Sequence, residues 1–327
     1  MSQNQTPSIY GGQAVIEGVM FAGKAANVTA VRRKNNEISF YEVPRQDKAW
    51  ITALKKIPLI RGIVGIVEAS AKGSKHLNFS AEAYAEDEVG PDEKAEAKIE
   101  EETKSGFSLT MILGVAVVGV LSFVFGKTVL TVLPILIEDF LFGDAFENQV
   151  VHTLIEGIIK ILFLLIYLFA ISQTKMIKRL FQYHGAEHKV ISAYEAGVEL
   201  TVSNVQKFST LHYRCGSSFI IFTVIVGVFI YSMVPYDSLW ERIYERMLLL
   251  PLVMGVSYEV LRFTNSLRET PVLRYLGYPG LWLQLLTTKE PTDDQVEVSI
   301  ASFNRVLELD RVLAESAVNV PVHGVKA

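Results

Sequence analysis

Long apolar runs alternate with charged stretches along this chain, and the apolar runs determine its predicted architecture. The first run, residues 107–126, contains no charged residue, and a helix of about 20 residues spans the hydrocarbon core of a bilayer. Further runs lie at 154–172, 217–234 and 247–261. The pattern therefore predicts four transmembrane helices. The last run includes a proline and a glutamate, so a buried or re-entrant helix is the alternative there.

Composition supports a membrane protein. Hydrophobic residues make up 50% of the 327 positions and charged residues 20%, whereas soluble domains average about 25% charged residues. The net charge of −4 gives no overall basic field for nucleic acid. The single cysteine, Cys215, excludes an internal disulfide framework.

Charges in the connecting segments predict the orientation. Basic residues are enriched before the first run, in the connection 173–216 and after the fourth run, and such segments stay in the cytoplasm. The connection between the first two runs is acidic, with Glu138, Asp139, Asp144 and Glu147. We therefore expect a multi-pass protein of the cell membrane with both termini in the cytoplasm. The polar first ten residues do not resemble a signal peptide.

The cytoplasmic parts differ in pattern. Residues 1–80 are expected to form an α+β arm, with β-prone stretches at 28–34 and 37–43 around Asn35-Asn36, residues suited to a tight turn. An apolar helical pattern over 57–71 fits either a helix on the membrane surface or a core helix. Residues 81–106 are acidic and poor in aromatics, which favours a linker or a solvated helix.

These segments together define the predicted organisation. A transmembrane bundle covers 107–262, and a C-terminal cytoplasmic segment, 263–327, contains a helix that begins near Thr292 or Asp293. The predicted fold class is a mainly α membrane protein with about four transmembrane helices and a small cytoplasmic α+β part.

The connection 173–216 holds the most specific chemical motif, His184-Gly185-Ala186-Glu187-His188. On a helix, His184 and His188 lie one turn apart on the same face. Two neutral imidazoles placed in this way can bind one Zn²⁺ or another divalent metal. Glu187 could bind the metal, orient a histidine or act as a catalytic base.

A second pair, His212 and Cys215, precedes the third apolar run. His184, His188, His212 and Cys215 would make a closed four-ligand zinc site, which is typical of a structural metal, whereas fewer ligands would leave an open, reactive position. The alternative is a polar helix and loop whose histidines bind backbone or water.

Four motifs in order resemble the bacterial YqhQ family. They are GGQAVIEGVM at 11–20, YHGAEHK at 183–189, RCGSSF at 214–219 and PGLWLQ at 279–284. The resemblance covers nearly the whole chain. It implies a bacterial multi-pass membrane protein, labelled as a predicted metal-dependent enzyme on its histidine motif, with no known reaction.

Two main functions follow from these observations. The first is a metal-dependent hydrolase at the cytoplasmic membrane face, with Glu187 as base and a membrane peptide or a lipid as substrate. The second is a membrane scaffold or assembly factor with a structural metal or none. A transporter is disfavoured because few charges lie within the predicted spans and the two halves show no repeat.

Overall fold

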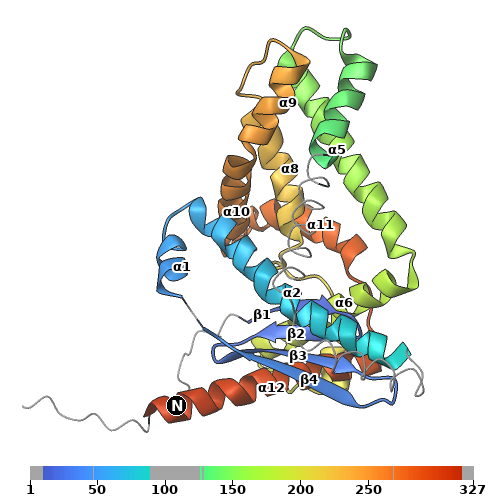
Figure 1. Cartoon of the computed structure of the whole chain (residues 1–327), viewed down its shortest axis with the longest axis vertical. Coiled ribbons are helices and arrows are strands. Elements are labelled where there is room, and N and C mark those ends of the chain that lie inside the picture. The colour runs from blue at the N-terminus through green and yellow to red at the C-terminus, as the bar shows by residue number, and fades with distance from the viewer. Residues whose placement is uncertain (1–9, 47, 89–125, 127–128, 268, 319–327) are drawn as a thin grey trace, which may run out of the picture.

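The computed structural model describes residues 10–46, 48–88, 126, 129–267 and 269–318. A helical bundle forms one end of the molecule, and a layer that contains a β-sheet forms the other (Figure 1). The first predicted transmembrane run, 107–126, lies outside the described residues except for its last position. The described residues are mainly helical with one small sheet, which confirms the predicted fold class at this level of detail.

The sheet is antiparallel, with strand order β1-β2-β3-β4. The strands are β1 (Gly11–Val15), β2 (Gly18–Ala22), β3 (Ala26–Arg32) and β4 (Ile38–Pro44). The turn predicted at Asn35-Asn36 is confirmed, because β3 and β4 pair on either side of it and Asn36 has a φ of 67°. Asparagine tolerates this left-handed conformation better than most residues.

Helices cover both faces of the sheet. On one face lie α6 (Lys175–Glu195) and α12 (Asp293–Val318), and on the other lies α2 (Ile60–Glu88). In the larger core cluster, Phe303 of α12 packs against Phe21, with ring centroids 4.9 Å apart. The predicted helix start near Thr292 is confirmed, because the Thr292 amide donates to the Gln295 side chain at 3.0 Å.

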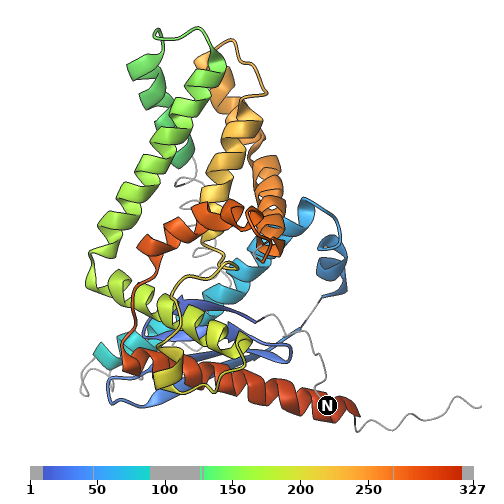
Figure 2. The same cartoon turned by 180° about the vertical axis from the view of Figure 1, so that it is seen from behind.

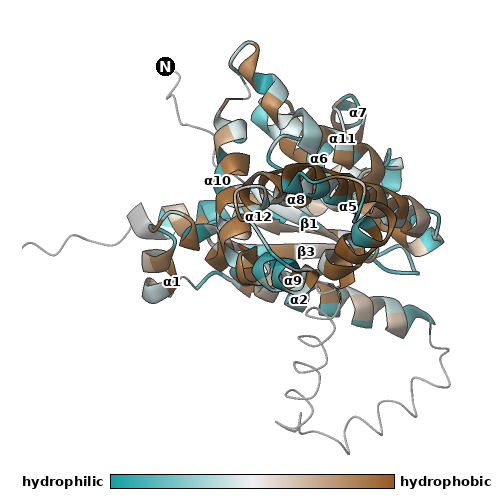
Figure 3. Ribbon diagram, turned by 90° about the horizontal axis from the view of Figure 1, so that it is seen from above, coloured by the Kyte–Doolittle hydropathy of each residue, from teal (hydrophilic) through white to brown (hydrophobic). Residues whose placement is uncertain are grey.

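The bundle at the other end contains the apolar helices. Its elements are a helix at 129–142, α5 (Gln149–Ser172), α8 (Ser218–Tyr231), α9 (Leu239–Leu248), α10 (Leu250–Ser266), η1 (Leu273–Gly277) and α11 (Tyr278–Thr287). Viewed from this end, the helices are dominated by hydrophobic residues (Figure 3). Two short helices, α1 (Ala49–Leu54) and α7 (Val202–Val205), lie in connecting segments.

Among the described residues, one single helix, α5, is both long enough and apolar enough to cross a membrane. Helices α9 and α10 meet the same criterion only as a pair, bent by 52° at their break, and α8 is a shorter apolar helix of 14 residues. The described chain therefore has one candidate span, or up to two. A membrane location is supported at this level, while the predicted number of four spans and the orientation are not established.

Two sequence-based interpretations concern charged segments. Glu138, which the charge pattern placed in an acidic outer connection, is completely buried, because Arg242 donates a hydrogen bond to it at 2.6 Å. Residues 81–88, for which a linker or a solvated helix was predicted, form the last turns of α2 and agree with the helical alternative; Asp87 there accepts a hydrogen bond from Arg33 at 3.0 Å. Tertiary ion pairs thus hold charged segments that composition alone assigns to the exterior.

Candidate metal centre

Helix α6 carries the histidine motif between the sheet and the bundle (Figure 2). Its buried apolar residues, such as Tyr183 and Val190, join the core formed with the sheet and α12. His184 and His188 lie on the side that lines a pocket. The predicted placement of both histidines on one helical face is therefore confirmed, with ring centroids 4.5 Å apart.

Gly185 allows the chain after α11 to approach α6 closely. A Cβ atom at position 185 would lie 2.2 Å from the carbonyl oxygen of Lys289. The Lys289 amide donates to the carbonyl of Phe181 at 2.9 Å. This glycine, which lowers helix propensity, is explained by the close approach.

Backbone carbonyls fix the orientation of both imidazoles. His184 Nδ1 donates to the Thr287 carbonyl at 2.8 Å, and His188 Nδ1 donates to the Thr210 carbonyl at 2.5 Å. A carbonyl oxygen can only accept, so in the neutral form each ring carries its proton on Nδ1, and its Nε2 can act as an acceptor or a metal ligand. Metal-binding histidines are held in this way in proteins.

Cys215 lies opposite these nitrogen atoms. Its Sγ is 3.2 Å from His184 Nε2 and 3.0 Å from Ser217 Oγ. One potential ligand atom from each of His184, His188 and Cys215 lies within 4.8 Å of the other two. Burial lowers the pKa of His188, which favours the neutral imidazole that metals require.

His212, the fourth predicted ligand, is adjacent but outside this group. Its ring centroid is 5.6 Å from that of His188. Its Nε2 lies 3.7 Å from a carboxylate oxygen of Glu195, which also pairs with Arg214. The structure therefore gathers three of the four predicted ligands, with His212 next to them.

Glu187, the predicted base, is buried at the wall of the same pocket. It accepts a hydrogen bond from the Gly12 amide. Burial raises the pKa of Glu187, and the neighbouring His184 and His212 act in the opposite direction. Such a carboxyl group is suited to taking and returning a proton.

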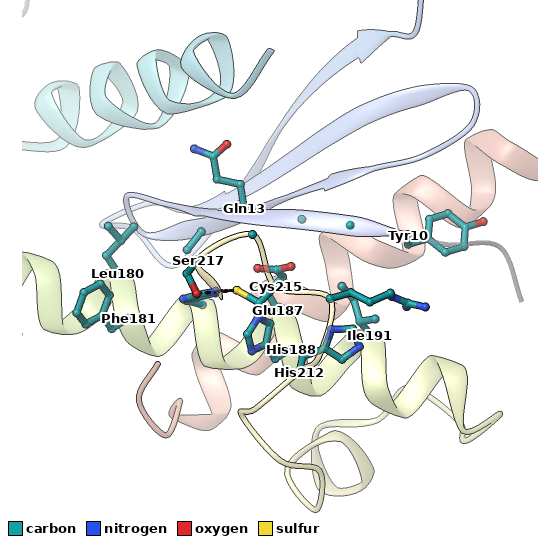
Figure 4. Close-up of a pocket in the computed structure, with 16 residues that line it drawn as sticks. Tyr10, Gln13, Leu180, Phe181, Glu187, His188, Ile191, His212, Cys215 and Ser217 are labelled. Carbon is teal, nitrogen blue, oxygen red and sulfur yellow. Dashed lines mark hydrogen bonds between the residues drawn. The ribbon is translucent and has the colours of Figure 1, made fainter. Parts of the chain in front are cut away.

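Gly12 is a functional position whose role the sequence did not indicate. A Cβ atom there would lie 2.8 Å from Glu187 Cγ. Figure 4 shows Glu187, His188 and Cys215 on the side of β1 opposite to Gln13. The glycine pair at 11–12, which lies in a turn-rich motif, thus allows β1 to lie directly against the acidic residue.

Gln284 is a second such position. It is completely buried, accepts a hydrogen bond from the His212 amide at 2.8 Å and donates to the His212 carbonyl at 2.8 Å. These two bonds fix the loop that carries Cys215. The PGLWLQ motif at 279–284, which contains Gln284, was the sequence feature that pointed to this residue, but its contact with His212 could not be predicted from the sequence.

The pocket has a volume of about 340 Å³. Three segments line it: the start of β1, the middle of α6 and the loop 212–217. Two imidazole nitrogens, one thiol and one carboxyl group therefore face a cavity large enough for a small part of a substrate. The donor set fits a borderline-soft divalent metal such as Zn²⁺.

Comparison with known proteins gives a family relationship. Residues 57–309 match the model of a family described as "Protein of unknown function (DUF1385)". The "Uncharacterized protein YqhQ" of Bacillus subtilis (strain 168) is 51% identical over 325 residues, which cover 99% of this chain and 100% of that protein. No solved structure shows significant similarity to the chain.

Proposed function

This chain belongs to the DUF1385 family, whose function is unknown, and we propose that it is a metal-dependent hydrolase of the cytoplasmic membrane face. In this proposal His184, His188 and Cys215 hold one divalent metal ion, with Zn²⁺ as the first candidate. Glu187 serves as the general base. The resemblance to the YqhQ family that the sequence motifs indicated is confirmed by the 51% identity to the Bacillus subtilis protein.

The observation that carries the proposal is the convergence of three prepared ligand atoms. They lie within 4.8 Å of one another, and ligands around a tetrahedral zinc ion are separated by about 3.4–3.6 Å, given the usual zinc–nitrogen and zinc–sulfur distances. Small side-chain movements would therefore suffice. Both histidines already direct their Nδ1 protons to backbone carbonyls.

Three protein ligands favour a catalytic site over a structural one, because tetrahedral zinc then keeps a fourth position for water or substrate. When bound, the ion would supply Lewis-acid chemistry and lower the pKa of a bound water. The chain itself supplies the carboxyl group of Glu187, which is buried at the pocket wall and can accept a proton there.

The membrane location of the proposal is supported by the bundle. Large apolar side chains are exposed along α5, including Ile158, Leu162 and Ile166, and exposed apolar surface of this kind is typical of an interaction with lipid. We propose four spans with both termini in the cytoplasm, from the distribution of basic residues in the sequence. The pocket would then lie at the cytoplasmic base of the bundle.

A structural metal in a membrane scaffold is the second candidate, and the position of His212 favours it. The His212 ring lies beside that of His188, with centroids 5.6 Å apart, and its Nε2 would have to leave Glu195 to become a fourth ligand. Four protein ligands would close the site and exclude a catalytic water.

Metal analysis of the purified full-length chain tests the proposal. We expect about one zinc ion per chain, and loss of most of it in the His184→Ala, His188→Ala and Cys215→Ser variants. The Glu187→Gln variant should keep the metal. Equal metal content in all four variants would exclude the site.

Cobalt substitution separates the two candidates. A thiolate-to-cobalt charge-transfer band that disappears in Cys215→Ser would establish Cys215 as a ligand. His212→Ala is the decisive variant, because an open site keeps its metal and its cobalt spectrum after this change. A closed site loses a ligand, and its spectrum changes.

A further inference from the structure

The outer edge of β1 forms part of the pocket that contains the candidate metal centre. Within the part of the chain that the structure describes, β1 is an edge strand, since the sheet order places only β2 beside it. Residues Gly11, Gly12, Gln13 and Ala14 line the cavity together with the histidines and Cys215. An edge strand presents unpaired backbone N–H and C=O groups, which can pair with another extended chain.

The pairing pattern shows which backbone groups of β1 face outward. The Arg32 amide donates to the carbonyl of Glu17 at 2.8 Å while Gly18 lies opposite Val31, so these opposed residues form a non-hydrogen-bonded pair. The N–H and C=O groups of Gly18 therefore point toward β1. They pair with Val15, its opposite residue in that strand.

Alternation along β1 then directs Gly12 and Ala14 away from β2, and Ile16 follows in the turn after the strand. Two contacts agree with this direction. The Gly12 amide donates to Glu187, and the Ile16 amide donates to Ser80 Oγ at 3.2 Å. Ala14, which lies between them, has no partner among the described residues for its outward N–H or C=O group.

The surroundings of Ala14 suit an extended peptide. Leu180, Phe181 and Ile191 provide apolar contacts in the pocket, and side chains of an added strand would alternate between the two faces of the sheet. One face holds the metal centre. A lipid substrate lacks the periodic N–H and C=O groups that would match this edge.

We propose that an extended peptide segment binds beside β1 as a fifth strand, pairing with the backbone of Ala14 and the carbonyl of Gly12, with one of its amide bonds at the metal centre. This inference rests on the proposed function and names the substrate class of that same site. Strand addition of this kind supplies affinity through the backbone, and side-chain pockets supply specificity.

The chemistry is the addition of one water molecule across the amide bond. A new C–O bond forms at the carbonyl carbon, and the C–N bond breaks. The proton that Glu187 takes from water passes to the leaving nitrogen, which yields one carboxylic acid and one amine. No oxidant or second substrate is required.

Binding of fluorescein-labelled casein, an unfolded protein with many extended segments, tests the inference. The full-length chain carries Glu187→Gln to prevent turnover, and fluorescence anisotropy measures affinity. Adding Ala14→Pro should weaken binding at least tenfold, because proline lacks the outward N–H group yet is tolerated on edge strands. The matched variant, Ala14→Ser, changes the side chain but keeps the N–H group, and should bind at least tenfold more tightly than the proline variant.

The outcomes distinguish the two levels of the proposal. Equal casein affinity in the proline and serine variants, at equal metal content, would overturn strand addition. If a metal-loaded chain does not bind casein, a peptide is not the substrate, although the metal site stands. Release of fatty acid from phosphatidylglycerol vesicles, without cleavage of casein, would lead to the same conclusion. A chain without metal would overturn the proposed function itself.

A second measurement uses the chain without substitutions, so that strand addition can be tested even if the proline variant does not fold. Casein segments cut by the chain are identified by mass spectrometry and resynthesised with alternate N-methylated amides. We expect these peptides to inhibit casein cleavage at least tenfold more weakly than their unmethylated counterparts. Equal inhibition would overturn strand addition.

Discussion

Two regions of this molecule bury charged and polar side chains, and they do so in opposite ways. At the end of the bundle distant from the sheet, a bundle-end cluster consists of Glu138, His152, Glu156, Arg242 and Arg246. Arg242 donates to both carboxylates, at 2.6 and 2.9 Å. His152 Nδ1 lies 2.6 Å from Glu138. Both carboxylates therefore have cationic partners, although Arg242 Nε, Arg246 Nε and Arg246 Nη1 are buried without a hydrogen-bond partner among the described residues.

The candidate metal centre is built differently. His184 and His188 each use only one ring nitrogen in bonds to the backbone, and the other faces a cavity. Glu187 forms no ion pair among the described residues, although it is buried. The charges of the bundle-end cluster pair with each other and join helices, whereas the buried groups on α6 face a cavity that could hold a ligand.

Breaking the bundle-end cluster should have the largest effect. Arg242→Met leaves Glu138 and Glu156 without their shared partner, and removal of one member of a buried ion pair costs about 3–5 kcal/mol. We expect a strongly lowered melting temperature in detergent, with metal content per folded chain unchanged. Arg311→Met, at an exposed position of α12, is the control and should stay within about 0.5 kcal/mol of the parent chain.

Gly185→Ala tests how closely the metal centre depends on the segment after α11. The added Cβ would meet the Lys289 carbonyl at 2.2 Å, and we expect a loss of about 1–3 kcal/mol from overpacking. The displaced segment carries the carbonyl that orients His184, so metal affinity should fall about 10–100-fold. Metal titration of both chains measures this.

The same substitution at Gly65 is its matched control. That position lies in α2 with no atom within 4 Å of an added Cβ. Alanine is a better helix former than glycine, so stability should rise by about 0.5–1 kcal/mol without a change in metal affinity. If both alanine variants bind metal equally weakly, the close approach at Gly185 is not the cause.

His76 is a buried histidine outside both regions. Its Nδ1 pairs with a side chain rather than with a backbone carbonyl, as in His184 and His188. It is 1% exposed and lies 2.7 Å from Thr29 Oγ1, measured from Nδ1. Burial lowers the pKa of His76 from 6.5 to about 4. Between these values the unfolded chain binds a proton that the folded chain does not, so stability rises with pH in this window.

We expect the free energy of unfolding to fall by about 1–2 kcal/mol from pH 7 to pH 5 through this group. His76→Gln keeps a polar partner for Thr29 and should remove that part of the slope. Denaturant unfolding at both pH values measures the difference between the two chains. Identical slopes would show that His76 is not responsible.

The smallest effect on stability is expected at the metal centre itself. Glu187→Gln removes a buried carboxyl group that has no cationic partner, so stability should change by less than about 1 kcal/mol or increase. Glu138→Gln, the matched change in the bundle-end cluster, weakens a paired carboxylate and should destabilise by about 2–4 kcal/mol. A larger loss for Glu187→Gln would contradict the distinction between the two regions.

Local patterns predicted the parts of the fold that depend on local causes. The hairpin around Asn35-Asn36, the start of α12 and the shared face of His184 and His188 were all readable from neighbouring residues. Glu156 and Lys160, one helical turn apart, also form an ion pair, as this spacing permits. Turn residues, helix caps and helical spacing act within a few positions.

The bundle-end cluster could not be predicted in the same way. Arg242 and Arg246 lie on one face of α9, but their partners Glu138 and Glu156 are about 90 to 100 positions earlier. From the sequence, few charges were expected inside the bundle, because an acidic connection and a charged helix are each compatible with exposure. Only tertiary contact shows that these charges neutralise one another.

The metal centre was predictable in composition but not in arrangement. The residue types and the helical spacing indicated His184, His188 and Cys215, while nothing in the sequence separated His212 from them. The roles of Gly12 and Gln284 depend on contacts with elements far away in the chain. Whether a metal is bound stays a prediction.

The distances along the chain between the parts of this site have a consequence for its synthesis. The pocket needs Gly12 from the start of the chain and the carbonyl of Thr287 from near its end. Asp310 then accepts hydrogen bonds from the amides of Lys24 and Ala25, which joins α12 to the turn after β2. During synthesis the site is therefore incomplete until the segment that contains Thr287 has joined the segment that contains Gly12.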